Sequence, residues 1–350
     1  MRRVAEGSQK IKNKGKMKNF YTGRDILVTG GCGSIGSEIV RRLLSFNPSK
    51  VRVFDNSEEG HFRLNQKLKS DRIRSLVGDV RDKNRLRRAV RGADIVFHAA
   101  ALKHVDLCEY NPDEAIYTNV IGTKNLVDAA TDENVAKFIG ISTDKAVNPI
   151  STMGATKLLG EKLIINAPHQ VSKTMFSVVR FGNVLNSSGS VIPIFRNQIK
   201  EGGPITITSK DMVRFFIKMN DAIGLIFKAA EIMKGNEIFI LKMKALRIAD
   251  LAQVMAEELA PKYGRNPKDI TFKIIGTKKG EKTNESLMTN EEAEHASIAG
   301  NLLIIKPQLP NSYGKTASGG KKPDDFEYNS INAKVLSKEE IRKMIPWDEI

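Results

Sequence analysis

Cysteines and long apolar runs are scarce in this chain. Only Cys32 and Cys108 occur among its 350 residues, too few for a disulfide framework and without the repeated spacing of a metal site. The longest apolar stretches, such as residues 93–102, are interrupted by polar side chains and are shorter than the about 20 residues that cross a bilayer. The sequence therefore predicts a protein of a reducing compartment, the cytoplasm, with no membrane span and no bound metal.

Acidic residues are outnumbered by basic ones, and the net charge at pH 7 is +16. The first twenty residues contribute seven lysines and arginines against one glutamate but no apolar segment, so they do not resemble a secretory signal. We expect this basic tail, residues 1–20, to be disordered. No nucleic-acid recognition motif accompanies the charge, so we expect no nucleic-acid partner; a phosphate-rich ligand would also suit a basic chain.

From residue 25 onward, short runs with strand character alternate with helical patterns. The segments between the runs, such as residues 35–44 and 118–130, space their apolar residues three and four apart, as helices that cover a sheet do. This alternation predicts an α/β protein with a Rossmann-like, doubly wound parallel sheet, which we assign to residues 21–185. The runs are residues 26–28, 51–54, 73–77, 95–98, 138–142 and 176–181.

After residue 183 the alternation lapses, and glycine-rich turns separate shorter elements. They predict a smaller C-terminal lobe, mainly residues 186–307, that binds the substrate. Residues 308–350 should form an exposed connection, rich in Pro, Gly, Ser and Lys, and a final helix at 338–344. Within the smaller lobe we expect helices at residues 221–233, 248–259 and 290–295, and strands at 205–207, 238–241 and 271–275.

The first strand leads directly into a glycine-rich turn, Thr29-Gly30-Gly31-Cys32-Gly33-Ser34-Ile35-Gly36, and a helix follows at once. In this context Gly30 permits a tight turn, Gly33 lets a pyrophosphate approach the backbone, and Gly36 lets helix and strand pack closely. The backbone N–H groups of Ser34 and Ile35, at the start of the helix, favour an anion. An ordinary strand-to-helix turn shows the same glycines, but this context favours a bound dinucleotide, so the larger domain should bind NAD(P).

Two carboxylates follow the next two strands. Asp55 ends the second strand, nineteen residues after the last glycine of the turn, where it can accept hydrogen bonds from the adenosine ribose. Asp79 and Val80 follow the third strand, at a position suited to the adenine. Because Asp55 would repel a 2′-phosphate, the sequence favours NAD over NADP, although Arg52 or Arg81 could still accommodate NADP.

The fourth and fifth strands end in residues that should meet at the carboxyl edge of the sheet, where ligands of such folds bind. Ala99 and Ala100 follow the fourth strand and should lie beside the cofactor, with Lys103 just beyond them. The fifth strand ends in Ser142-Thr143-Asp144-Lys145, and Lys157 lies twelve residues later, in the helix that follows. Alone, the Asp-Lys pair could be a solvated pair in a loop; together, these side chains predict one catalytic crevice.

The chain resembles the CapD-like polysaccharide biosynthesis family over roughly residues 25–296. Members of that family are extended short-chain dehydrogenases, and the best-understood ones are UDP-N-acetylglucosamine 4,6-dehydratases that feed flagellin or surface-glycan sugars. The UDP-sugar substrate is implied by this resemblance alone. The segments that carry the resemblance are residues 29–36, 98–105, 142–149, 153–157, 180–184 and 280–285.

The reaction implied by the resemblance explains the residue types. Hydride leaves C4 of the sugar for the nicotinamide, water is lost across C5 and C6, and the hydride returns to C6. The elimination needs an acid for the C6 hydroxyl and a base for the C5 proton, roles that the resemblance gives to Asp144 and Lys145. A lysine is a base only when partly neutral, and we expect positive charge from Lys103 and Lys157 to favour that form.

One position departs from the general short-chain dehydrogenase pattern Tyr-x-x-x-Lys, because this chain has Met153-Gly154-Ala155-Thr156-Lys157. A methionine cannot take the C4 hydroxyl proton, so we expect Thr143 to direct its hydroxyl at C4 and relay the proton. The membrane-anchored dehydratases of the family are similar in carrying methionine there, so the change does not imply a dead enzyme. Lys157 should still hold the nicotinamide ribose.

Further residues are candidates for the substrate. The resemblance puts Asn183 against the sugar or diphosphate. Arg214 is a candidate phosphate ligand because its planar fork matches phosphate geometry, with a plain surface arginine as the alternative. Gly280-Glu281-Lys282 is a candidate for contact with the nucleotide. His98 and His104 flank the cofactor edge and, without a carboxylate or cysteine cluster, should pack or hydrogen-bond rather than bind metal.

Two other functions stay open at this point. A nucleotide-sugar 4-epimerase, or a dehydratase that also epimerises C5, shares the fold and the cofactor site, while the adjacent Asp144 and Lys145 favour elimination. A non-catalytic regulator that keeps NAD as a structural ligand would explain the missing tyrosine. The resemblance also implies a homo-oligomer that pairs through helices.

Overall fold

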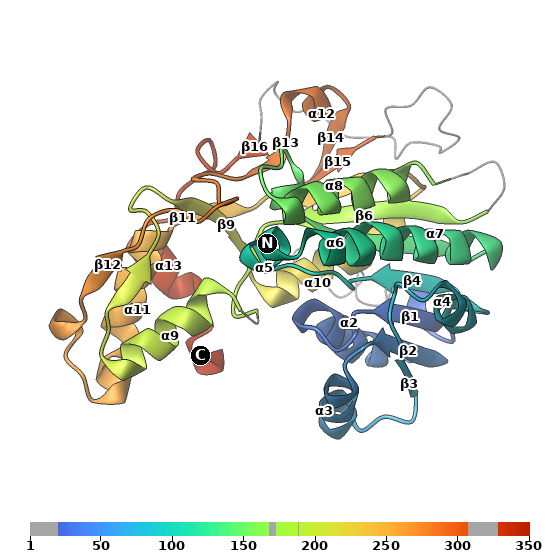
Figure 1. The fold of residues 1–350 in the computed structure, drawn as a ribbon, viewed down its shortest axis with the longest axis horizontal. Helices are drawn as coiled ribbons and strands as arrows, with labels where there is room; N and C mark the ends of the chain where they lie inside the picture. The colour runs from blue at the N-terminus through green and yellow to red at the C-terminus, as the bar shows by residue number, and fades with distance from the viewer. Residues whose placement is uncertain (1–19, 168–172, 188, 307–327) are drawn as a thin grey trace, which may run out of the picture.

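The computed structural model describes residues 20–167, 173–187, 189–306 and 328–350. Almost all of the basic tail and most of the connection predicted from residue 308 lie outside these described residues. The final helix lies within them, as α13 (Lys338–Met344), at the bounds that the sequence predicts. Figure 1 shows a larger lobe built around one sheet and a smaller lobe beside it.

The larger lobe contains a nine-stranded sheet with the order β14-β15-β10-β6-β5-β4-β1-β2-β3. Neighbouring strands from β3 through β10 run parallel, and β15 and β14 add an antiparallel edge. This is the expected Rossmann-like fold, wound outward from β1 in both directions. The strands are β1 (Asp25–Thr29), β2 (Lys50–Asp55), β3 (Ile73–Val77), β4 (Ile95–His98), β5 (Lys137–Thr143), β6 (Met175–Phe181), β10 (Ile238–Leu241), β14 (Ala296–Ala299) and β15 (Leu302–Ile305).

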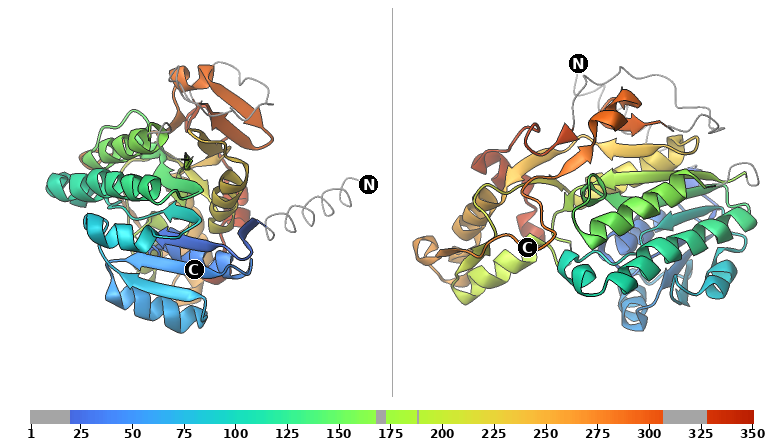
Figure 2. Two further views of the ribbon diagram at one scale, coloured as in Figure 1. Left: turned by 90° about the vertical axis from the view of Figure 1, so that its right-hand side faces the viewer. Right: turned by 45° about the horizontal axis from the view of Figure 1, so that its top comes forward.

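Helices cover both faces of this sheet, as Figure 2 shows. On one face α2 contacts α10, and on the other α7 lies between α4 and α8. The buried side chains Ile39, Val40 and Leu43 show how α2 is attached, because they form one apolar stripe toward the sheet. The helices of the larger lobe are α2 (Ser34–Leu44), α3 (Glu58–Leu68), α4 (Lys83–Val90), α5 (Val105–Tyr110), α6 (Pro112–Ala115), α7 (Gly122–Asp132), α8 (Thr152–Ile165), α10 (Met219–Ile232) and α12 (Asn290–Glu294).

The predicted strands of the first half are confirmed as β1 to β6, with ends that differ by at most one residue. The sequence places the strand at 238–241 in the smaller lobe, and this placement is wrong. That strand is β10, which pairs in parallel with β6 in the main sheet. The physical reason is α10, whose buried face packs on β5 and β6 and returns the chain to the sheet. Residues 186–307 therefore contribute to both lobes.

The smaller lobe has an apolar core of its own. Ile192 and Phe195 of α9 and Leu251 and Met255 of α11 are buried in it. The strands β11-β9-β7 form a three-stranded sheet, and β8 pairs with β12. The remaining strands and α-helices after β6 are β7 (Asn183–Val184), α9 (Val191–Glu201), β8 (Ile205–Ile207), β9 (Val213–Ile217), β11 (Lys244–Arg247), α11 (Ile248–Leu259), β12 (Phe272–Ile274), β13 (Ser286–Met288) and β16 (Tyr328–Asn329).

The segment between α6 and α7 is a π-helix, η1 (Ile116–Ile121), where the sequence predicts an ordinary helix from residue 118. Such turns of π-helix occur frequently at functional sites. In the described ranges, no helix combines the length and apolar character needed to span a membrane.

Candidate active site

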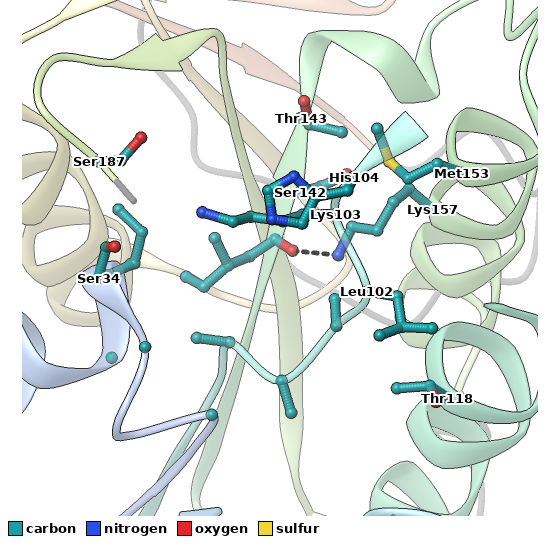
Figure 3. Close-up of a pocket in the computed structure, with 18 of the residues that line it drawn as sticks. Ser34, Leu102, Lys103, His104, Thr118, Ser142, Thr143, Met153, Lys157 and Ser187 are labelled. Carbon is teal, nitrogen blue, oxygen red and sulfur yellow. Dashed lines mark hydrogen bonds between the residues drawn. The ribbon is translucent and has the colours of Figure 1, made fainter. Parts of the chain in front are cut away.

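A cavity of about 740 Å³ lies at the carboxyl edge of the parallel strands, where the chain passes into the smaller lobe. Figure 3 shows Ser34 of the glycine turn and Lys157 of α8 on opposite sides of this space. Two predicted site residues, Asp144 and Arg214, do not line it. The predicted residues that do are Gly30, Gly33, Ser34, Ile35, Gly36, Asp55, Asp79, Val80, Ala99, Ala100, Lys103, Thr143, Lys145, Lys157 and Asn183.

The glycine turn has no room for side chains at its two critical positions. Gly30 has a φ of +65°, and a Cβ there would overlap the backbone of Ala99 and Ala100. A Cβ on Gly36 would overlap the carbonyl oxygen of Gly30. Gly33 caps α2 without a side-chain hydrogen bond, so the first N–H groups of the helix face the cavity and can receive a phosphate.

Asp55 is attached to the glycine turn by its own carboxylate. Its Oδ2 accepts a hydrogen bond from the N–H of Cys32 at 3.0 Å, and its Oδ1 accepts one from the N–H of Ser57 at 3.0 Å. Burial raises the pKa of the Cys32 thiol to about 12, and the charge of Asp55 adds to the rise. Cys32 is therefore an inert thiol, while Asp55 presents a negative charge to the cavity.

The two arginines that could have accommodated a 2′-phosphate both pair with carboxylates, although Arg81 also lines the cavity. Arg81 binds Asp79 and lies 2.7 Å from Glu114, and the hydrogen bonds from Arg81 hold the pKa of Asp79 below its usual value. Arg52 binds Asp25 at 2.7 Å and does not line the cavity. The carboxylate of Asp55, in contrast, is hydrogen-bonded to the glycine turn itself and lines the cavity.

Lys157 reaches from α8 to the end of β5. Its Nζ donates a hydrogen bond to the carbonyl oxygen of Ile141 at 2.7 Å, drawn in Figure 3. Burial lowers the pKa of Lys157 to about 8. Met153 lies one helical turn earlier and is buried against Cys108 and Ala115; it occupies the position of the tyrosine in the general Tyr-x-x-x-Lys pattern. Lys157 is thus the titratable group that α8 offers to the cavity.

His98 is held in one neutral tautomer under the cavity floor. Thr123 donates its hydroxyl proton to the carbonyl of Asn119, so it must accept from Nε2 of His98 at 2.9 Å. Nδ1 of His98 is then the acceptor for the hydroxyl of Thr29 at 2.7 Å. Burial lowers the pKa of His98 to about 3, and Lys157 adds to the decrease. These contacts match the packing and hydrogen-bonding role expected of His98.

Asn119 is a buried residue that supports the segment after β4 without lining the cavity, and the sequence analysis missed it. Its side chain accepts from the N–H of Leu102 and donates to the carbonyl of the same residue, at 2.8 and 3.0 Å, and also donates to Thr156 at 3.0 Å. It lies in the π-helix η1, so the irregular turn directs one amide at the segment after β4. The signal that could have revealed it is an asparagine inside an otherwise apolar helical stretch.

Thr143, Asp144 and Lys145 form one hydrogen-bonded group at the end of β5. The Thr143 hydroxyl and the Lys145 ammonium both donate to Oδ1 of Asp144, each at 2.9 Å. Asp144 is fully buried, and its Oδ2 has no hydrogen-bond partner within the described part of the chain. The aspartate therefore lies behind Thr143 and Lys145, which are the members that line the cavity.

Lys145 lies between two carboxylates. Its Nζ is 3.8 Å from Oε1 of Glu285, a buried residue that the sequence analysis did not single out. Burial alone would lower the pKa of Lys145, but Asp144 and Glu285 outweigh burial and the pKa is raised. The expectation that Lys103 and Lys157 make Lys145 partly neutral is therefore not met, because the charges that act most strongly on this amine are negative.

Arg214 is directed away from the cavity, contrary to the expectation of a phosphate ligand. Its guanidinium donates to the carbonyls of Lys282 and Thr283 and is buried. Lys282 is likewise directed elsewhere, with Nζ donating to the carbonyl of Val147 at 2.7 Å. Asn183, in contrast, lines the cavity and donates to the carbonyl of Phe215 at 3.1 Å. The structure thus leaves Asn183 as the predicted substrate residue beyond β6.

Acidic, histidine and cysteine side chains do not gather into a possible metal site: over the described residues, no group of three or more could hold an ion. The side chains that line the cavity carry hydroxyl, amine and carboxylate groups, among them Thr143, Lys145 and Asp55. Together with the anion-binding helix start and the Asp55 carboxylate, this suits a dinucleotide beside a polar substrate.

Comparison with known proteins agrees with this geometry. Residues 26–307 match the family described as polysaccharide biosynthesis protein. A Methanocaldococcus jannaschii protein described as an uncharacterized membrane protein is 54% identical, over 94% of this chain and 97% of its own. The capsular polysaccharide biosynthesis protein CapD of Staphylococcus aureus is 43% identical over 77% of this chain, which spans only 46% of CapD.

Relatives with named reactions are of two kinds. A UDP-N-acetylglucosamine 4,6-dehydratase (inverting) of Campylobacter jejuni is 37% identical, over 89% of this chain and 94% of its own. A UDP-glucose 4-epimerase of Rickettsia bellii is 39% identical, over 93% of this chain and 96% of its own. Sequence identity therefore does not separate dehydratase from epimerase.

Solved structures show the same fold. Pen from Bacillus thuringiensis is 41% identical, with a TM-score of 0.89 over 94% of this chain and 98% of its own. A double mutant of DesIV, a dTDP-glucose 4,6-dehydratase from Streptomyces venezuelae with NAD and DAU bound, is 25% identical, with a TM-score of 0.66 over 74% of this chain and 86% of its own. By its sequence match and its fold, the chain belongs to the polysaccharide biosynthesis protein family, and CapD is one of its relatives.

Proposed function

We propose that this protein is a nucleotide-sugar 4,6-dehydratase that uses NAD and acts on UDP-N-acetylglucosamine. The observation that carries the proposal is the hydrogen-bonded group of Thr143, Asp144 and Lys145, which joins a buried acid to an amine at the wall of the cofactor cavity. Acid and base on adjacent residues are what an elimination of water needs. The Campylobacter jejuni dehydratase, at 37% identity over most of both chains, supports the choice of reaction and substrate.

The residues present fit NAD. The N–H groups at the start of α2 would hold the pyrophosphate, Asp55 the adenosine ribose, Asp79 and Val80 the adenine, and Lys157 the nicotinamide ribose. When bound, the nicotinamide would accept a hydride from the sugar and return it. Asp55 would repel a 2′-phosphate, and Arg81 already binds two carboxylates, which supports NAD rather than NADP. The NAD bound to the DesIV double mutant agrees with this choice.

A proton shift within the group would create the reactive form. As an ion pair, Asp144 has no proton to donate and Lys145 has no lone pair to offer. Moving one proton along their 2.9 Å hydrogen bond gives a neutral carboxyl and a neutral amine together. The amine can then accept the C5 proton while the carboxyl supplies the proton that leaves with the C6 hydroxyl. The pair thereby returns to its ionised state. When C6 is reduced, the Lys145 ammonium gives a proton back to C5, and the amine then regains from water a proton that replaces the one released from the C4 hydroxyl.

Thr143 is the proposed route by which a proton passes between the sugar and the buried aspartate. Its hydroxyl lies 2.9 Å from Oδ1 of Asp144 and its side chain lines the cavity. A hydroxyl can accept one proton and donate another, whereas Met153 can do neither. This arrangement supports Thr143 as the group that replaces the tyrosine in handling the C4 hydroxyl proton.

The second candidate function is a nucleotide-sugar 4-epimerase, favoured by the Rickettsia bellii relative at 39% identity. An epimerase needs no acid–base pair for loss of water, so the Asp144–Lys145 pair argues for the dehydratase. A non-catalytic NAD-binding regulator would not need the buried Asp144, which Thr143 and Lys145 link to the cavity wall.

The decisive experiment incubates the purified chain with NAD and UDP-N-acetylglucosamine in deuterated water and follows the sugar nucleotide by mass spectrometry. A dehydratase yields a product that has lost one water and, because C5 is deprotonated and reprotonated, has gained solvent deuterium. A product of unchanged mass but changed C4 configuration would establish the epimerase instead. No conversion with NAD bound would favour the regulator.

Asp144→Asn tests the proposed acid in the same assay. The amide keeps the shape of the side chain but cannot donate the elimination proton as a carboxyl can, so we expect kcat to fall by about two to four powers of ten with NAD binding retained. Glu291→Gln, on an exposed position of α12, is the charge-matched control. An unchanged rate in Asp144→Asn would remove Asp144 from the mechanism.

A further inference from the structure

The segment 280–285, which we call the strap, runs from the smaller lobe back to the loop after β5. Lys282 fixes it by donating to the carbonyl of Val147 at 2.7 Å. Gly280 adopts a φ of +75°, and a Cβ added there would lie 2.9 Å from Cβ of Ser151, the residue that caps α8. The strap therefore packs directly on the segment that holds Asp144 and Lys145 and on the start of the helix that carries Lys157.

Arg214 holds the strap from the other side. Its Nη1 donates to the carbonyl of Thr283 at 2.8 Å and its Nη2 to the carbonyl of Lys282. These bonds explain why the guanidinium is not available to the cavity. They also fix the backbone immediately before Glu285, the last residue of the strap.

Glu285 directs its carboxylate at the catalytic group. Its Oε1 lies 3.8 Å from Nζ of Lys145 and 3.9 Å from Nε of Arg214, and its Oε2 lies 3.9 Å from Nζ of Lys282. The residue is buried, and Oε2 has no hydrogen-bond partner among the residues that the structure describes. A buried carboxylate oxygen left without a donor is unfavourable for stability, so its presence points to a role in the site.

We propose that Glu285 is a positioning residue for the dehydratase reaction: its carboxylate opposes that of Asp144 across the Lys145 amine and sets how readily Lys145 passes its proton to Asp144. This inference rests on the proposed function. It gives the strap, and Arg214 with it, a task in the site that does not involve contact with the substrate.

The charges around the amine explain the effect. Lys145 faces Asp144 from its own loop, Glu285 from the strap and Arg214 from β9, while Lys282 faces Glu285. An ionised Glu285 stabilises the ammonium form of Lys145 and so opposes the proton shift. A protonated Glu285 releases the amine to its neutral form, and burial favours this state because it raises the pKa of the Glu285 carboxyl.

The test is Glu285→Gln in the full-length chain, with Glu291→Gln as the charge-matched control. Competitive acetylation with acetic anhydride across a pH series, read at Lys145 by mass spectrometry, gives the pKa of that amine without requiring turnover. We expect the pKa of Lys145 to fall by about 0.5–2 units in Glu285→Gln, because the amine loses an anionic neighbour, and to stay unchanged in Glu291→Gln. Glu285→Asp keeps the negative charge but places it further from Lys145, so the pKa of Lys145 should fall by less.

The kinetic arm measures kcat against pH for the same variants. A base that must be neutral makes kcat rise with pH, so we expect this rise to move to lower pH in Glu285→Gln, with KM for the sugar nucleotide changed less than about twofold. If the wild type dehydrates the sugar but the pKa of Lys145 is unchanged in Glu285→Gln, the role of Glu285 is overturned and the proposed function stands. Absence of dehydration by the wild type would overturn the proposed function, and the role in the reaction with it.

Discussion

At the scale of single residues, His98 shows most directly how packing decides chemistry. Its two ring nitrogens are matched to one donor, the hydroxyl of Thr29, and one acceptor, the oxygen of Thr123. A protonated ring would have two N–H donors, and Nδ1–H would displace the Thr29 hydroxyl proton. The imidazole beneath the cavity is therefore a neutral structural group, and the proposed proton transfer involves the side chains at the end of β5 instead.

His98 should make stability depend on pH. The histidine of the unfolded chain takes up a proton as pH falls below about 6.5, whereas burial holds the pKa of His98 in the fold at about 3. Between these values the unfolded state binds more protons, so stability decreases as pH falls, by up to roughly 1.4 kcal/mol per pH unit. Urea unfolding of the wild type and of His98→Gln from pH 7.5 to 5 measures this, and the variant should lose less stability on acidification. Equal losses would assign the pH dependence to other groups.

Residue types and spacing could identify the glycine turn and Asp55, because a dinucleotide-binding strand-turn-helix unit needs these residue types at fixed positions. They could also identify Lys157, from its place in the helix that follows the fifth strand. They could not show that Arg214 would be directed at backbone carbonyls. That outcome depends on the strap, whose first residue, Gly280, lies 66 residues after Arg214 in the sequence. Glu285 was missed for the same reason: its partner Lys145 is brought to it only by the meeting of the two lobes.

At the scale of elements, one buried arginine joins four of them. Arg180 of β6 lies 2.6 Å from Glu161 of α8 and 2.9 Å from Glu292 of α12, and it also donates to the carbonyl of Leu287. These bonds attach the helix that carries Lys157, and the segment that follows the strap, to the carboxyl end of β6. The network therefore fixes the position of α8 relative to the sheet.

Arg180→Met should destabilise the protein strongly. The change leaves the carboxylates of Glu161 and Glu292 without their cation in a buried environment, so we expect the free energy of unfolding to fall by about 3–5 kcal/mol. Arg63→Met is the matched control, because Arg63 pairs with Glu59 at 2.6 Å but both side chains are largely exposed; its cost should be below about 1 kcal/mol. Chemical denaturation measures both. A similar loss in the two variants would contradict the importance of burial.

The elements that the sequence identified best have strong local patterns. The helix at 248–259 and the strands at 73–77, 95–98 and 205–207 have the bounds that the sequence predicts. The strand that contains Arg214 was missed, because the sequence analysis considered Arg214 only as a phosphate ligand or a surface arginine. Membership in a sheet is decided by pairing across long separations, so β10 could be recognised as a strand from its sequence but not placed beside β6.

At the scale of the whole molecule, the cavity and the proposed catalytic group depend on both lobes. The main sheet supplies the glycine turn and β5, while the smaller lobe supplies the strap that holds Glu285 against Lys145. The expected homo-oligomer stays a prediction. Large apolar side chains that pairing through helices would cover are exposed on α5, η1 and α8, namely Tyr110, Tyr117 and Leu159.

Cofactor binding should stabilise the whole chain, and selectively. A ligand that binds only the folded state at 100 times its Kd adds about 2.7 kcal/mol of stability, which for a chain of this length corresponds to a rise in Tm of roughly 3–4 °C. We expect NAD to produce this rise and NADP at the same concentration to produce less, because the 2′-phosphate would approach the Asp55 carboxylate. Asp55→Asn removes that charge and should bring the two shifts closer together, with the melting curve of the unliganded variant as its reference. Thermal unfolding with each dinucleotide decides the matter, and an equal or larger rise with NADP on the wild type would show that Asp55 does not select the cofactor.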